Sequence, residues 1–166
     1  MRTLVAIVGY RNLSDFSVGP VLLPALQAVE WGPGVDVDDL SYGPIAVVQN
    51  LEDRPLYDRM IFLSAVVRDR VPGKVYRRRF DATPRTEEEI QARIEEAVTG
   101  VIDLDNLLVI AQHFRVLAPE VVTIEVEPLE RESGESFSAE VSAILPGILE
   151  LVRTEANGGS TSSTVH

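Results

Sequence analysis

Residues 4–20 of the chain read LVAIVGYRNLSDFSVGP. The stretch begins with a short apolar run, passes through a polar turn marked by Gly9, and leads into a helix-like apolar pattern from Val18. An apolar run too short for a membrane span, followed by such a turn and a helix, is how an α/β sheet usually begins. Ligands of these sheets bind in the loops that leave the carboxyl ends of the strands. Asn12 and Asp15 therefore occupy a candidate site.

The composition indicates one globular domain and excludes several kinds of site. The chain has 166 residues, of which 45% are hydrophobic and 25% charged, with a net charge of −11 and no cysteine. An acidic chain is a poor partner for nucleic acid or for an anionic membrane, and it favours a basic partner surface. The lack of cysteine excludes disulfides, cysteine-based metal sites and a cysteine nucleophile. Because no signal peptide or membrane-length apolar run is apparent, we expect a soluble, cytoplasmic protein.

Apolar periodicity predicts strands that alternate with helices along the chain. The expected strands are 3–8, 35–38, 59–67, 74–80 and 121–126, and the expected helices begin near residues 18, 44, 86, 103 and 138. This order implies a single three-layer α/β domain over 1–154, phosphorylase/hydrolase-like, with a mixed, mostly parallel sheet of about five strands and helices on both faces. The strand at 74–80 carries Arg77, Arg78 and Arg79, a composition typical of an edge strand blunted by charge. The polar tail, 155–166, is expected to be disordered.

Several motifs recur in an order that carries a family resemblance. The stretch 9–12 (GYRN) precedes DFSVG at 15–19, an apolar strand at 62–66 precedes PGKVY at 72–76, and PEVV at 119–122 precedes EVEP at 125–128 and a helix from 138 to 146. Over roughly residues 3–152 this order resembles the hydrogenase maturation proteases. Those enzymes trim the C-terminal tail from the large subunit of nickel–iron hydrogenases after the metal centre is loaded.

The resemblance implies a metal-contacting set that this chain replaces. The family uses an acid after the first strand, an aspartate ending the third strand and a histidine near the start of a later helix. These positions fall on Phe16, Ser64 and a point near Gly100. Nickel needs imidazole or carboxylate donors, whereas a phenyl ring offers none and a serine hydroxyl is a poor neutral ligand. Asp15 is the one acid that could still serve as a metal ligand, the alternative being a helix-capping or first-turn role.

The resemblance, combined with these substitutions, predicts a protein that grips the hydrogenase large subunit without cutting it, as an assembly or chaperone-like factor. Asn12, Asp15, Tyr42 and Gly43 follow the first two strands and are expected to line the gripping groove. No intrinsic cofactor is expected, and nickel would enter only through the substrate. One alternative is an active endopeptidase that uses Asp15 and displaced ligands. Another is a small-molecule-binding α/β module unrelated to hydrogenase, so whether the chain is an enzyme stays open.

Other catalytic motifs are missing from the sequence. No Gly-x-Ser-x-Gly elbow and no phosphate-binding Gly-x-x-x-x-Gly-Lys-Ser/Thr loop occurs. His113 follows a polar helix face and is expected at the surface. What the arginines at 77–79 contact is left open by the sequence.

Overall fold

The computed structural model describes residues 1–158. Its strands are β1 (Thr3–Ile7), β2 (Val35–Asp39), β3 (Arg59–Ala65), β4 (Val75–Arg79) and β5 (Glu120–Val126). Its helices are the 3₁₀ turn η1 (Ser14–Ser17), α1 (Val18–Ala28), α2 (Pro44–Glu52), α3 (Glu87–Val98), α4 (Leu104–His113) and α5 (Ala139–Ala156). The predicted strands and helices are therefore all present, with bounds shifted by a few residues.

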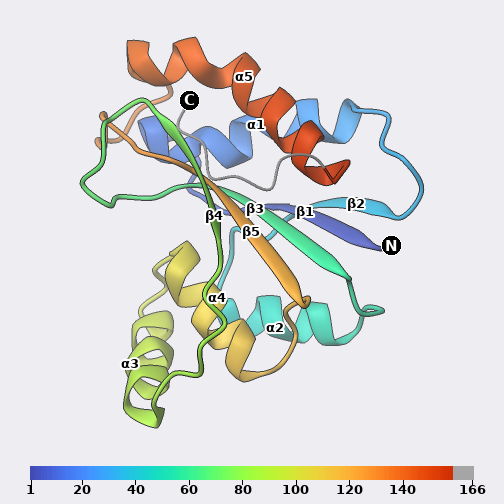
Figure 1. Ribbon diagram of the computed structural model, residues 1–166. Helices are drawn as coiled ribbons and strands as arrows, with labels where there is room; N and C mark the ends of the chain where they lie inside the picture. Colours follow the sequence, from blue (N-terminus) through green and yellow to red (C-terminus); the bar gives the residue numbers. More distant parts are fainter. Residues whose placement is uncertain (159–166) are drawn as a thin grey trace.

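The five strands form one sheet in the order β2-β1-β3-β5-β4. β4 pairs antiparallel with β5, and the other neighbours pair in parallel. Helices α1 and α5 cover one face of the sheet, α2 and α4 lie on the other, and α3 packs against α4 on that same side (Figure 1). The predicted three-layer, mostly parallel α/β fold and the edge position of β4 are thus confirmed.

Both faces of the central strands are buried, which explains why β1 and β3 are almost wholly apolar. Along β1, Leu4 and Ala6 face the core on the α2 and α4 side, whereas Val5 and Ile7 face the core under α1 and α5. This alternation is the period-two geometry of a strand, and burial on both faces removes any need for polar positions. Because β2, β1, β3 and β5 run parallel, their carboxyl ends lie at the same edge of the sheet.

Local capping signals position the helices. Thr86 caps α3 in a reciprocal capping box with Glu89, and the Ser138 hydroxyl accepts a hydrogen bond from the amide of Val141 to begin α5. Pro44 occupies the first turn of α2, where its missing N–H costs nothing. None of the helices among residues 1–158 is sufficiently long and apolar to cross a membrane.

Two charged positions differ from the sequence-based expectation. The first residues of the tail that was expected to be disordered from 155 belong to α5, which continues to Ala156 with Glu155 buried against Arg59 and Arg77. Arg77 is therefore a buried partner rather than part of an exposed charged edge. The rest of the predicted tail, 159–166, lies outside the described residues.

Candidate functional site

Asp15 ties the loop after β1 to the loop that precedes α5. It lies in the first turn of η1 and is fully buried. Its Oδ2 accepts hydrogen bonds from the amides of Leu129 (2.9 Å) and Glu130 (2.7 Å) and from the Ser138 hydroxyl (2.8 Å), and its Oδ1 accepts one from the Ser138 amide (2.8 Å). Both carboxylate oxygens thus have a structural use in this geometry. Its service as a metal ligand stays a prediction.

A cavity of about 300 Å³ opens at the carboxyl ends of β1 and β3. We call it the strand-end cavity; it is lined by Gly9, Tyr10, Phe16, residues 64–67 and residues 101–105. Phe16 and Ser64, far apart in sequence, line it together. The lining segment 101–105 follows directly after Gly100. The three positions that the resemblance singled out thus lie at or beside one cavity.

The polar groups of the strand-end cavity are already engaged within the protein. The Ser64 hydroxyl donates to the backbone oxygen of Val8 at 2.7 Å, and the Tyr10 hydroxyl accepts from the Ile102 amide at 2.7 Å. Asp103 caps α4 by accepting from the Asp105 amide at 2.9 Å. Burial is the largest influence on Asp103 and raises the pKa of its carboxyl above the ordinary value.

The donors at this cavity do not make a set suited to a resident metal ion. Asp105 accepts two hydrogen bonds from Arg68, at 3.0 and 2.7 Å, which leaves Asp103 as the carboxylate not bound by a cation. Among residues 1–158 no group of three histidine, cysteine, aspartate or glutamate side chains is placed to hold a metal. An aromatic ring and an engaged hydroxyl at the remaining positions supply no replacement donors.

The other residues expected in the gripping groove lie apart from this cavity. Asn12 adopts a left-handed backbone conformation (φ 57°), and its backbone oxygen accepts from the Gly134 amide at 3.0 Å. Tyr42 is half-buried, and its hydroxyl accepts from the side-chain amide of Asn50 at 2.9 Å. Gly43 is exposed at the start of α2. None of the three lines the strand-end cavity, and their role in partner binding stays a prediction.

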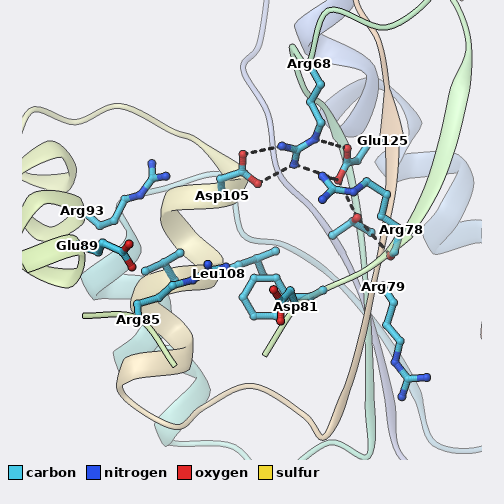
Figure 2. Close-up of a pocket in the computed structure, with 13 residues that line it drawn as sticks. Arg68, Arg78, Arg79, Asp81, Arg85, Glu89, Arg93, Asp105, Leu108 and Glu125 are labelled. Atoms are coloured by element: carbon cyan, nitrogen blue, oxygen red, sulfur yellow. Dashed lines mark hydrogen bonds and ion pairs between the residues drawn. The ribbon is translucent and has the colours of Figure 1, made fainter. Parts of the chain in front are cut away.

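A second cavity, which the sequence analysis missed, lies between β4, β5, α3 and α4 (Figure 2). We call it the arginine cleft; it has a volume of about 350 Å³. It is lined by Arg68, Arg78, Arg79, Phe80, Asp81, Arg85, Glu89, Arg93, Asp105, Leu108, Val109, Thr123 and Glu125. A cluster of five arginines is unexpected on a chain with a net charge of −11. Asp105 also lines the strand-end cavity, so the two hollows adjoin.

The carboxylate of Glu125 lies at the floor of the arginine cleft and accepts several hydrogen bonds there. Arg68 donates to its two oxygens at 2.7 and 3.2 Å, and the Thr123 hydroxyl donates at 2.8 Å (Figure 2). Arg70 lies 2.9 Å from the same carboxylate. Burial by itself would raise the pKa of Glu125, but these hydrogen bonds and charges outweigh it and lower the pKa below its ordinary value. The signal in the sequence was a glutamate inside a strand of β-branched residues, a position that demands a buried cation.

His113 is exposed at the end of α4, as predicted, with its ring edge-on to that of Phe114.

Comparison with known proteins places the fold. No family model and no curated protein matches the chain. Among solved structures, a hydrogenase 2 maturation peptidase from Thaumarchaeota archaeon SCGC_AB-539-E09 is 28% identical, with a TM-score of 0.65 over 96% of this chain and 100% of the other. The hydrogenase maturating endopeptidase HybD from E. coli is 20% identical, with a TM-score of 0.72 over 99% of this chain and 96% of the other.

A third similar structure is the NiFe hydrogenase maturation protease HycI from Thermococcus kodakarensis KOD1. It is 16% identical, with a TM-score of 0.66 over 94% of this chain and 92% of the other. At such low identity HybD and HycI show only that the fold is similar. The Thaumarchaeota peptidase is also similar in sequence over nearly the whole length of the chain. The chain therefore has the fold of the hydrogenase maturation proteases and resembles one of them in sequence.

Proposed function

We propose that this protein acts in the maturation of a nickel–iron hydrogenase large subunit as a non-proteolytic, assembly or chaperone-like factor. The similarity of its fold to solved hydrogenase maturation proteases supports a place in hydrogenase maturation. The observation that carries the non-proteolytic part is the lining of the strand-end cavity. Phe16 and Ser64 stand there, and the segment after Gly100 contributes Val101 and Ile102 rather than a histidine.

This lining favours contact with a polypeptide over coordination of an ion. Val67 and Val101 are partly exposed at the cavity, and the half-buried ring of Phe16 faces the same space. Covering apolar surface of this kind with a partner's side chain favours binding by about 25 cal/mol per Å² of area buried. Nickel belongs to the bound large subunit in this proposal, and the chain's own residues supply the grip.

The test combines a binding assay with a cleavage assay. Nickel-loaded large-subunit precursor from the source organism is incubated with the protein, recovered by pull-down and examined by mass spectrometry. We expect capture of the precursor with its C-terminal tail intact. Phe16→Glu should weaken capture by placing a charge in the apolar cavity. Phe114→Glu, at an exposed aromatic residue outside the cavity lining, is the matched control and should leave capture unchanged.

An active endopeptidase is the second candidate, and Asp103 favours it. This half-buried carboxylate lines the strand-end cavity without an ion-pair partner among the described residues, and its raised pKa is typical of acids with a functional use. Trimming of the tail that is abolished by Asp103→Asn or Asp15→Ala, in variants shown to be folded by circular dichroism, would overturn the non-proteolytic proposal. Absence of any capture of a large subunit would instead favour the small-molecule-binding module.

A further inference from the structure

The arginines of the arginine cleft fall into two groups. Arg68 is saturated, because it bridges Asp105 and Glu125 with four hydrogen bonds at 2.7–3.2 Å. Arg78 approaches a carboxylate only at 3.6 Å, with 48% of its side chain exposed. Arg85 makes no ion pair with the described residues, and its buried Nε has no hydrogen-bond partner among them. One arginine therefore builds the floor, and others present unused donors.

The remaining acids of the cleft do not take up these donors. Asp81 is bonded by the amide and hydroxyl of Thr83 at 2.9 and 2.6 Å. Glu89 accepts the Thr86 amide at 3.3 Å as part of the capping box of α3. Neither forms an ion pair with an arginine of the part of the chain that the structure describes. Arg85 therefore has no carboxylate partner among the described residues, and Arg78 has only the long contact to Glu125. Arg93 pairs along its own helix with Glu96 at 3.4 Å, a residue outside the cleft lining.

We propose that the arginine cleft binds a ligand that carries two or more oxyanion groups, carboxylates or phosphates. Arg78 comes from β4, Arg85 from the loop before α3, and Arg93 from α3 itself, so the donors reach the cleft from separate elements (Figure 2). A guanidinium offers a planar fork of N–H donors that matches a carboxylate or phosphate. The volume of about 350 Å³ exceeds what a single carboxylate fills, and Leu108 adds an apolar residue to the lining.

Two sources can supply this chemistry: a small free polyanion, or the acidic side chains of a bound polypeptide. The inference goes beyond the proposed function and does not rest on it. The net charge of −11 repels anions at long range, so an anion that binds must do so through direct contacts in a local site.

The experiment is an NMR and calorimetric titration of the full chain at low ionic strength with citrate, pyrophosphate and a hexaglutamate peptide. We expect at least one probe to bind with a Kd of about 1 mM or tighter, with amide shifts centred on residues 78–93. Arg78→Gln and Arg85→Gln should each weaken binding about tenfold or more, because each removes charge-assisted hydrogen bonds. Thermal unfolding of each variant establishes that it is folded.

Arg153→Gln is the matched control, since it removes the same charge from α5 on the opposite face of the sheet (Figure 1). It should leave the affinity within about twofold. Stronger binding of citrate or pyrophosphate assigns the cleft to a free anion, whereas stronger binding of hexaglutamate assigns it to acidic side chains. The proposal is overturned if no probe binds at low ionic strength, or if Arg153→Gln weakens binding as much as the cleft variants do.

Discussion

Replacing Glu155 by glutamine tests the buried ion-pair network that anchors the end of α5 to the sheet. The Glu155 side chain is 1% exposed, and those of Arg59 and Arg77 are 5% and 9% exposed. Arg77 donates from Nε and Nη2 to the two oxygens of Glu155 at 2.7 and 2.9 Å, and Arg59 binds the same carboxylate. Bidentate guanidinium–carboxylate contacts are among the stronger polar interactions in proteins. The hydrogen bonds that Arg77 donates to Glu155 also raise the pKa of Arg77, so the arginine stays charged throughout the accessible pH range.

Glutamine preserves the shape of the side chain but leaves Arg59 and Arg77 buried beside a neutral amide. Breaking a buried ion pair from one side costs about 3–5 kcal/mol, because the charge left behind is uncompensated. We expect Glu155→Gln to lower the free energy of unfolding by about this amount, measured by urea denaturation followed by far-UV circular dichroism.

Two further variants sharpen this measurement. Glu150→Gln, on the same helix, removes an exposed pair with Arg153 and should cost about 0.5 kcal/mol or less. Replacing Glu155, Arg59 and Arg77 together by apolar residues of similar size should recover most of the loss. A cost below about 1 kcal/mol for Glu155→Gln would refute the reasoning, since it would mean that the arginines are not desolvated as the structure places them.

The remaining predictions concern three other positions. Asp15→Asn leaves backbone amides of the loop before α5 without their charged acceptor, so we expect a loss of about 2–4 kcal/mol and faster hydrogen exchange at 129–138, whereas unchanged exchange would contradict the anchoring role. Glu125 has a lowered pKa in the folded protein, so its contribution to stability is complete above its ordinary pKa of 4.5 and is lost as pH falls through the folded pKa. Glu125→Gln should therefore reduce the fall in the free energy of unfolding at acid pH. An equal fall in both proteins would contradict this prediction. Gly73→Ala should cost about 1–3 kcal/mol because of its φ of +74° and a Cβ only 2.4 Å from that of Glu140, while Gly43→Ala, with open space around it, should be near neutral in the same urea assay.

The position of the strand-end cavity could be anticipated from the sequence, but its boundaries could not. The family resemblance placed its metal-contacting positions after the first strand and at the end of the third, and the rule that ligands bind at the carboxyl ends of strands pointed to the same edge of the sheet. Phe16 and Ser64 do line one cavity. Tyr42 and Gly43 were assigned to the same groove by the same rule, yet the cavity lining excludes them. Strand order decides this, because β2 lies outside β1 while the cavity opens on the β3 side.

The sequence by itself determined the strands, the helices and the layer arrangement, since periodicity, turn residues and caps such as Thr86 and Ser138 act within a few residues of one another. Only the tertiary structure decided which charges are buried. Glu155 was predicted to begin a polar tail, but arginines from distant segments pair with it in the core, as Arg68 does with Glu125. A charged carboxylate is buried without a large free-energy cost only where a cation pairs with it. These ion pairs join residues that are 57 to 96 positions apart in the sequence.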